Sequence, residues 1–406
     1  MKKLLKYLSP FAPDQSGACG VLYELGGIIV ICDAGGCAGN ICGFDEPRWF
    51  KNKSAVFSAG LRDMDAIMGR DDKLIEKLSR AHEQLGAKFS ALVATPVPAV
   101  IGTDMKALKR MAEKKLGIPC IAVNAIGTRY YDEGESEAWL QLFETFVDGE
   151  TDNNEFDNSE SDNSESGDLG ETPASGKIGV IGATPFETGY STDKPLKSYL
   201  EKQGLSNTVI YTVGTTLEDV KKAAGCEKNL VVSTGGIKAA DYLKERFGVP
   251  YEVGFPFIPD EVIERAKGKL VGLAQYSENE SENESDNKTD NKVKVLIVHS
   301  QFAANEMRKR LVWFVNESGL SKGAEYSFDV STFFAMLPEY AEEGDIHLGG
   351  EDDLWSLAAE GGYDLIIADS DMERLIHAAG YKGEYSDFPH FAVSGRMNDD
   401  SVMFFS

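Results

Sequence analysis

The residues best suited to chemistry are four cysteines near the start of the chain. Cys19, Cys32, Cys37 and Cys42 lie close together, and the last three are evenly spaced in the glycine-rich run ICDAGGCAGNICG. Thiolates are soft ligands for iron–sulfur clusters, whose sulfides also accept backbone N–H bonds. The C-x4-C-x4-C spacing is wider than that of common zinc sites. We expect these thiols to hold an iron–sulfur cluster, with [4Fe–4S] as the expected type, although four thiols also fit [2Fe–2S].

Two alternatives for these thiols stay open. Cys32 ends the apolar run Gly26–Ile31, which is typical of a buried strand, so it could be a small apolar core residue. A cluster that bridges two subunits would need only some of the thiols from each chain. The remaining cysteines are interpreted as core, because Cys120 lies inside the strand-like IPCIAV and Cys226 ends a helix.

The strand before Cys32 indicates how the thiols are positioned. In open α/β sheets, functional residues lie at the carboxyl ends of the strands. A second such place is VVSTGG, where Ser233 and Gly235 stand between a predicted strand and a predicted helix. We expect Ser233 and Gly235 to help bind an anionic cofactor group at that helix start, with a plain structural turn as the alternative.

The whole chain alternates predicted strands and helices. This pattern predicts an α/β fold of three Rossmann-like parallel-sheet domains. Their expected bounds are 1–149 for the cysteine-rich domain, 176–276 for the second and 293–406 for the third. No GxxxxGK[ST] or GxGxxG motif occurs, so we expect no ATP or dinucleotide site in this chain.

Two acidic tracts separate the three domains. Residues 150–175 and 277–292 are rich in Asp, Glu, Asn and Ser and poor in apolar residues, which predicts disordered linkers. They carry much of the net charge of −25, which argues against a nucleic-acid partner. No apolar stretch reaches the length of a bilayer, so we expect no membrane partner. Lys6 and Pro10 interrupt the N-terminal apolar run, and we therefore expect a cytoplasmic protein.

The order of motifs resembles nitrogenase component 1 and its relatives, which include the dark-operative protochlorophyllide reductases. The resemblance covers almost the whole chain outside the two acidic tracts. It depends on five segments in order: GACGVLYELGGIIVICDAGGCAGN, AVFSAGLRDMDAIMGRDDKLIEKL, TPVPAVIGTDMKAL, TTLEDVKKA with NLVVSTGGIKAADYLKERFGVPYEVGFP, and DLIIADSD.

The resemblance implies three Rossmann-like domains around a metal centre. It also implies an oxidoreductase subunit that accepts low-potential electrons from an ATP-dependent, nitrogenase iron-protein-like reductase. A Cys-ligated iron–sulfur cluster would receive these electrons, and the chain would form a homodimer or a heterodimer with a related subunit. The substrate could be a tetrapyrrole, a small unsaturated or sulfur compound, or a metal complex.

The chain departs from the family at several ligand positions. Cys37 matches the family's Gly-Cys ligand, but the two other ligands align near Pro13 and with Thr95 or Pro96. Ser233 stands where nitrogenase proper holds its iron–molybdenum cofactor with a cysteine. The resemblance therefore implies a divergent member and not a true nitrogenase. The alternative function is a non-catalytic carrier or assembly scaffold for a cluster or metal cofactor. A periplasmic-type binding protein is a more distant alternative.

Overall fold

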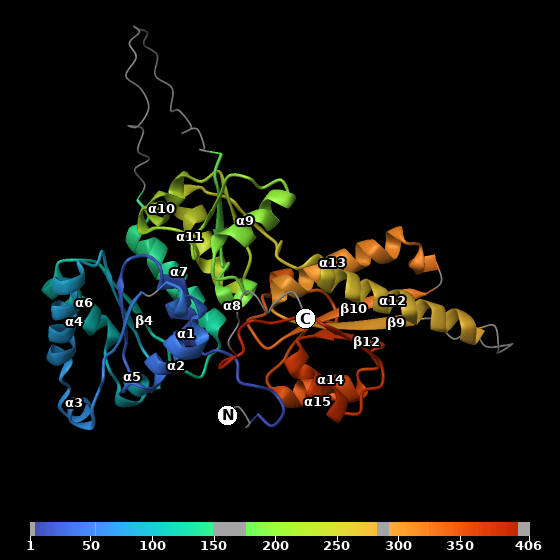
Figure 1. The fold of residues 1–406 in the computed structure, drawn as a ribbon, viewed down its shortest axis with the longest axis horizontal. Coiled ribbons are helices and arrows are strands. Elements are labelled where there is room, and N and C mark those ends of the chain that lie inside the picture. Colours follow the sequence, from blue (N-terminus) through green and yellow to red (C-terminus); the bar gives the residue numbers. More distant parts are fainter. Residues whose placement is uncertain (1–4, 53, 149–175, 282–291, 323, 397–406) are drawn as a thin grey trace, which may run out of the picture.

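The chain forms three lobes, each built around one parallel β-sheet (Figure 1). The computed structural model describes residues 5–52, 54–148, 176–281, 292–322 and 324–396. Every strand pair in the three sheets is parallel. The predicted α/β class with three parallel sheets is confirmed.

The first sheet has the order β2-β1-β3-β4. Its strands are β1 (Ile28–Ile31), β2 (Ala55–Ser58), β3 (Ser90–Val93) and β4 (Cys120–Val123). Side chains of β1 alternate between two apolar clusters. Ile29 and Ile31 pack with α1 (Asp14–Leu22) and α7 (Tyr131–Phe146), whereas Ile28 and Val30 pack with α4 (Asp71–Leu85) and α6 (Met105–Leu116). This double coverage explains why β1 is apolar at every position.

Helices α1 and α7 cross at very short range, and two glycines make the crossing possible. A Cβ atom on Gly17 would overlap the Tyr131 carbonyl group, and one on Gly134 would overlap the Asp14 carbonyl group. Both contacts involve backbone atoms, which cannot rotate away as a side chain can. The crossing therefore requires glycine on each helix.

The second and third sheets follow the same plan. The second sheet has the order β6-β5-β7-β8, from β5 (Ile178–Ile181), β6 (Thr208–Ile210), β7 (Lys228–Val231) and β8 (Tyr251–Val253). The third has the order β11-β10-β9-β12-β13, from β9 (Lys292–Val298), β10 (Glu325–Thr332), β11 (Ile346–His347), β12 (Leu365–Ala368) and β13 (Glu384–Asp387). The second lobe also contains α8 (Pro185–Thr188), α9 (Asp193–Lys202), α10 (Leu217–Lys221) and α11 (Ile237–Phe247). The helices of the third lobe are α12 (Asp260–Ser281), α13 (Gln301–Glu317), α14 (Glu351–Glu360) and α15 (Ser370–Ala378).

The predicted linkers compare with the structure in different ways. Residues 150–175 lie outside the described residues. At the second tract, α12 continues to Ser281 and β9 already begins at Lys292, so both ends of 277–292 belong to regular elements. Extending a helix that is already formed adds one hydrogen bond per ordered residue, which favours its continuation into a polar sequence. Residues 282–291 lie outside the described residues.

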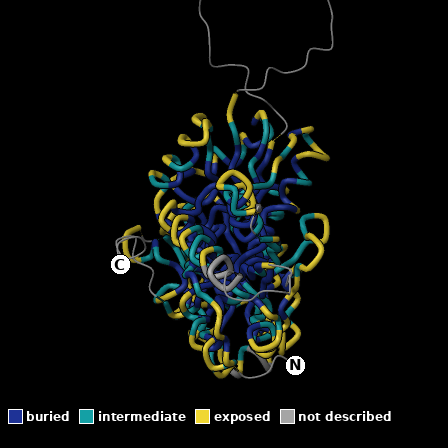
Figure 2. The backbone as a smooth tube through the Cα atoms, turned by 90° about the vertical axis from the view of Figure 1, so that its right-hand side faces the viewer, coloured by how far each residue is buried: buried dark blue, intermediate teal, exposed yellow. Residues whose placement is uncertain are grey.

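The N-terminal segment connects the first and third lobes. Phe11 forms an antiparallel bridge with Val393, and Pro13 forms one with Tyr130. The backbone N–H groups of residues 6–8 donate to the Glu351 carboxylate. Buried backbone runs through the middle of the molecule, and exposed segments surround it (Figure 2). Among the described residues, no helix combines the length and the apolar character needed to cross a membrane.

Candidate functional site

Cys32 directly follows β1 and is completely enclosed. Its side chain is 1% exposed and packs in the cluster formed with α4 and α6, on the same face of the sheet as Val30. Burial raises the pKa of its thiol to about 12, and Asp33 and Cys120 add to this effect. A neutral thiol in an apolar cluster behaves as a small core residue. Cys32 as a cluster ligand stays a prediction.

Cys19 lies on the opposite side of the first sheet. It is buried in α1, in the cluster that contains Ile29 and Ile31. Burial raises the pKa of Cys19 well above its usual range, and the neighbouring Glu46 and Cys42 raise it further. Cys42 is partly exposed on the π-helical turn Ile41–Asp45, and its pKa is raised to about 11 by burial and by Glu46. The structure thus brings Cys19 and Cys42 near each other, and separates Cys19 from Cys32.

Cys37 lies on the short helix α2 (Gly36–Asn40), is partly exposed, and packs against the cluster that contains Cys19. Burial and then Asp33 raise the pKa of its thiol, while a hydrogen bond with the Thr95 side chain acts in the opposite direction. The Asp33 carboxylate accepts the Ala38 N–H at 2.8 Å and the Ser58 hydroxyl at 2.6 Å. Asp33 therefore fixes the start of α2 to the end of β2. Position 95, where the resemblance placed a further family ligand, does lie beside Cys37.

Three glycines near Cys37 leave the backbone there uncovered by side chains. Cβ atoms added to Gly36, Gly39 or Gly43 would meet no atom within 4 Å, and none of the three has a positive φ. Packing within this chain does not explain why these positions are glycine. Glycine at such places permits close approach of a ligand or another backbone. The surface of α2 is therefore suited to contact from outside the chain.

We tested whether these donors fit an iron–sulfur cluster. Within the part of the chain that the structure describes, no group of three or more His, Cys, Asp or Glu side chains could hold a metal ion. Cys32 packs on one face of the first sheet, whereas Cys19 is buried in the cluster on the other face and Cys37 packs against that same cluster. The described donors of one chain are therefore not gathered into a single metal site, and the four-thiol cluster stays a prediction. The partly exposed Cys37 and Cys42, on one continuous helical stretch, fit one side of a shared site.

Ser233 and Gly235 lie at the contact between the first and second lobes. Ser233 is 1% exposed, and its hydroxyl oxygen has no hydrogen-bond partner among the described residues. A Cβ atom on Gly235 would lie 3.1 Å from the Asp132 carbonyl oxygen and 3.2 Å from a Glu135 carboxyl oxygen. The predicted anion-binding turn thus faces an acidic side chain of its own chain. Its role in binding a cofactor stays a prediction.

Three buried carboxyl groups lie where the lobes meet, and the sequence analysis missed all of them. Glu187 of α8 accepts hydrogen bonds from the Tyr131 hydroxyl of the first lobe (2.7 Å) and the Ser300 hydroxyl of the third (2.9 Å). Glu135 accepts from the Thr184 hydroxyl at 2.6 Å, and Asp132 accepts from the Ala335 N–H at 2.7 Å. Each carboxyl group links different lobes. Acids inside an otherwise helical pattern give no sequence signal of such burial.

Burial dominates the protonation of these carboxyl groups. It raises the pKa of Glu187 to about 7 and that of Asp132 to about 6. The pKa of Glu135 lies well above its usual range because of burial and the nearby Glu187, and within the described part of the chain one of its oxygens has no hydrogen-bond partner. Two adjacent buried carboxyl groups resist simultaneous ionisation. The junction of the lobes therefore retains protons near neutral pH.

Two buried histidines adjoin this junction from the third lobe. The rings of His299 and His390 are 4.6 Å apart, and His390 stacks on Phe334 at 4.7 Å. Burial lowers the pKa of both, that of His299 to about 4, so both imidazoles are neutral at pH 7. In the part of the chain that the structure describes, the His390 Nε2 atom has no hydrogen-bond partner. A cavity of only about 10 Å³ lies between Glu187 and His299, so side chains fill this part of the junction.

Comparison with known proteins agrees with this architecture. Nitrogenase iron-molybdenum cofactor biosynthesis protein NifE of Clostridium pasteurianum is 25% identical over 227 residues, which are 55% of this chain and 44% of that protein. The match thus spans less than half of that relative. The solved structure of nitrogenase Cp1 at pH 6.5 has a TM-score of 0.62 at 14% identity, covering 98% of this chain and 88% of that one. Nitrogenase Cp1 at pH 5 has a TM-score of 0.59 at 16% identity, covering 99% and 86%.

The structural likeness shows a shared fold, and the family assignment comes from the sequence. Residues 16–288, more than half of the chain, match the family described as nitrogenase component 1 type oxidoreductase. The matched range includes the cysteine-bearing segments, the second sheet and the predicted Ser233 turn. The chain therefore belongs to the nitrogenase component 1 type oxidoreductase family, as its order of motifs predicted.

Proposed function

We propose that this chain is a carrier or assembly subunit for a metal–sulfur cluster, which it holds at a surface shared with a second chain. One observation carries the proposal: partly exposed Cys37 lies on a bare glycine backbone, while Cys19 and Cys32 are buried on opposite faces of a sheet. A surface of this kind can present a ligand to a cluster without enclosing it.

Cys37 and Cys42 are the ligands that this chain would contribute. A cluster bound there would supply one-electron redox capacity. Asp33 holds the helix that carries Cys37, through its bonds to Ala38 and Ser58. Metal binding would also have to displace the thiol protons, since burial and Glu46 raise the pKa of Cys42. The remaining ligands would come from a second copy of this chain or from a related subunit.

The nature of the relatives supports a carrier. The curated relative is named as a cofactor biosynthesis protein, although it matches over less than half of its length. Ser233 replaces the cysteine that the family resemblance places at this position, and its hydroxyl is a poorer ligand for iron than a thiolate. Buried carboxyl groups and aromatic rings occupy the junction of the lobes.

An electron-accepting reductase subunit is the second candidate. A specific observation favours it: Glu135 and Glu187 are buried carboxyl groups whose pKa is raised, so they could donate protons to a substrate as electrons arrive. In this function an ATP-dependent iron-protein-like reductase would deliver electrons to a [4Fe–4S] cluster, and Cys19 and Cys32 could join Cys37 and Cys42 as ligands after rearrangement.

The test is iron and acid-labile sulfide content after strictly anaerobic purification of the full chain. We expect iron and sulfide in the wild type and their loss in Cys37→Ser and Cys42→Ser. Cys226→Ser is the matched control, since Cys226 is buried beside the Tyr211 hydroxyl, far along the chain from the cluster segment. Iron-free wild type that also refuses reconstitution with iron and sulfide would contradict both candidates. If Cys19→Ser and Cys32→Ser also lose iron, the result would support the predicted site with all four thiols as ligands.

Two further assays separate the carrier from the reductase. A carrier passes iron and sulfide to an apo-ferredoxin acceptor, whereas a reductase subunit oxidises dithionite-reduced iron protein in the presence of MgATP. Transfer without oxidation supports the carrier. Oxidation of the iron protein that depends on MgATP and on Cys37 would overturn it in favour of the reductase.

A further inference from the structure

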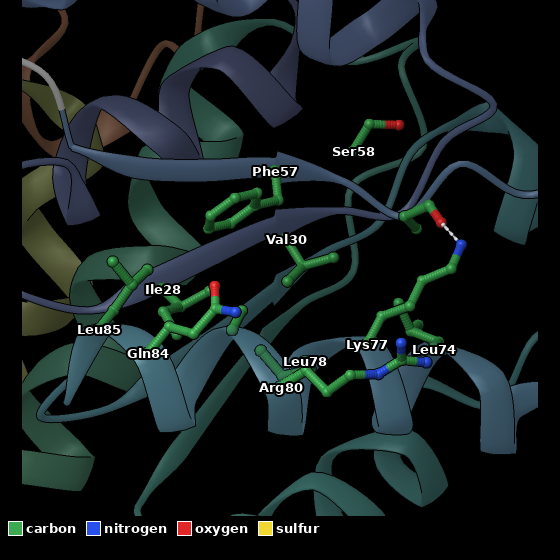
Figure 3. A pocket seen from close by; sticks show the side chains of 12 residues that line it. Ile28, Val30, Phe57, Ser58, Leu74, Lys77, Leu78, Arg80, Gln84 and Leu85 are labelled. Atoms are coloured by element: carbon green, nitrogen blue, oxygen red, sulfur yellow. Dashed lines mark hydrogen bonds between the residues drawn. The ribbon is translucent and has the colours of Figure 1, made fainter.

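A pocket of about 350 Å³ lies between the edge of the first sheet and helix α4, and its lining contains neither a cysteine nor a carboxyl group (Figure 3). Strand residues form one wall and α4 forms the other. The lining residues are Ile28, Val30, Phe57, Ser58, Ala59, Leu74, Lys77, Leu78, Arg80, Ala81, Gln84 and Leu85. The volume falls in the range of about 300–1,000 Å³ that is typical of small-molecule sites.

The pocket exists because α4 does not cover the edge strand β2. Helix α4 packs on β1, where Val30 is buried, whereas β2 is the edge strand, with no partner on its outer side among the described residues. As a result Phe57 is 42% exposed and Leu85 is 53% exposed. Figure 3 shows Phe57 above and the α4 side chains below, with Ile28 and Val30 at the back. The walls therefore favour an apolar occupant.

The charged residues at this pocket indicate that an apolar occupant would carry a negative charge at one end. Its two charged lining residues, Lys77 and Arg80, are both cations, although the whole chain has a net charge of −25. Both side chains extend toward the Leu74 end of the pocket (Figure 3). Lys77 donates to the Ala59 carbonyl oxygen at 2.9 Å, and Arg80 forms an exposed pair with Glu76 at 3.3 Å. Such exposed pairs are weak, and a guanidinium has donors to spare for an anion.

We propose that this pocket binds a small amphipathic carboxylate. Its aliphatic body lies against Ile28, Val30 and Leu78, and its carboxylate meets Arg80 and Lys77. The occupant is a free small molecule of the medium-chain fatty acid class, because an open apolar groove with cations at one end matches that chemistry. This inference does not depend on the proposed cluster function.

The test uses decanoate as the probe and calorimetric titration of the full chain as the readout. We expect one saturable site per chain, and about tenfold or greater weakening in Arg80→Glu, because a charged hydrogen bond is replaced by repulsion. Ala81→Trp, which fills the pocket, abolishes binding. Arg110→Glu is the matched control, since Arg110 is exposed on α6 and does not line the pocket. Decanol, which lacks the charge, binds at least about tenfold more weakly.

Three results would overturn the proposal: no saturable heat with decanoate, equal affinity in Arg80→Glu and Arg110→Glu, or equal affinity for decanol. A fourth is a change in oligomeric mass by light scattering in Arg80→Glu but not in Arg110→Glu, which would identify this face as a contact between copies of the chain. If Ala81→Trp fails to fold in a thermal unfolding assay, the exposed Arg80→Glu and the decanol comparison still decide the outcome.

Discussion

Glu187 is the side chain on which all three lobes converge. It belongs to the second lobe and accepts hydrogen bonds from Tyr131 of the first and Ser300 of the third. A carboxyl group buried at this place is either an anion that has lost its hydration, which costs free energy, or a neutral protonated acid. Because burial raises its pKa to about 7, protonation prevails on the acid side of neutrality.

We predict that Glu187 makes stability fall with rising pH. The folded state holds a proton that the unfolded state releases near pH 4.5, so the contribution is complete below that pH and is lost as pH passes about 7. Buried neutral His299 has the opposite effect, but only below its unfolded pKa, so pH 6.5–8 is the informative window. Between pH 6.5 and pH 8 the contribution of Glu187 to the free energy of unfolding should fall by about 1 kcal/mol. Thermal unfolding of Glu187→Gln should show a flatter pH dependence, whereas Glu360→Gln on the surface should match the wild type.

The burial of the thiols predicts which cysteines react with an alkylating reagent. Under native conditions, iodoacetamide should modify Cys37 and Cys42, which are partly exposed, and spare Cys19 and Cys32. Modification of Cys42 should accelerate about tenfold per pH unit up to about 11, since the thiolate is the nucleophile. Peptide mass spectrometry measures this, with urea-unfolded protein as the control in which all six cysteines react. Fast labelling of Cys19 or Cys32 would contradict the observed packing.

Residue types and spacing predicted which cysteines matter but not where their side chains lie. Cys32 continues the alternation of β1 and therefore shares a face with Val30. Cys19 reaches the other face only because α1 packs there. That placement depends on the contact of α1 with α7, whose partners lie more than a hundred residues apart in the sequence. No local pattern contains such information.

At the scale of elements, the crossing of α1 and α7 gives the sharpest stability prediction. Gly17→Ala or Gly134→Ala forces a methyl group into backbone atoms and should lower the free energy of unfolding by about 1–3 kcal/mol or more. Gly39→Ala is the control, because nothing lies within 4 Å of its added Cβ. Alanine there should be neutral or stabilising by up to about 1 kcal/mol. Denaturant unfolding measures all three, and equal stability of the Gly17 and Gly39 variants would contradict the close crossing.

Strands with a buried apolar run were predictable from the sequence, whereas the short strand β11 and the polar strand β13 were missed, as were some helices. Buried apolar runs such as IIVI and SALV are recognisable as strands from the sequence. Helix α6 was also recognisable, because Asp104 caps its start with bonds to two N–H groups and Gly117 ends it with φ +72°. Helix α1 was missed, since DQSGACGVL is buried on every side and has no apolar periodicity.

At the scale of the whole molecule, each lobe contacts both of the others. Arg48 of the first lobe donates to the Thr212 carbonyl oxygen of the second at 2.7 Å. Glu187 links the second to the third through Ser300. Asp132 and the Phe11–Val393 bridge link the first to the third. The three parallel sheets were predictable from the sequence, whereas these polar contacts were not, because each joins residues from distant segments.

The Phe11–Val393 bridge has a consequence for how the molecule tolerates a broken backbone. The lobes form a closed triangle of contacts, so two routes of attachment survive when one covalent connection is lost. A tobacco etch virus protease site inserted between residues 150 and 175 should therefore yield two fragments that elute together from a sizing column. Phe11→Asp places a charge beside the rings of Phe333 and Phe334 and should weaken the contact between the first and third lobes. In this variant the two fragments should separate once the chain is cleaved, whereas the uncleaved chain stays in one piece. Immediate separation of the wild-type fragments would mean that the backbone, and not the triangle, holds the lobes together.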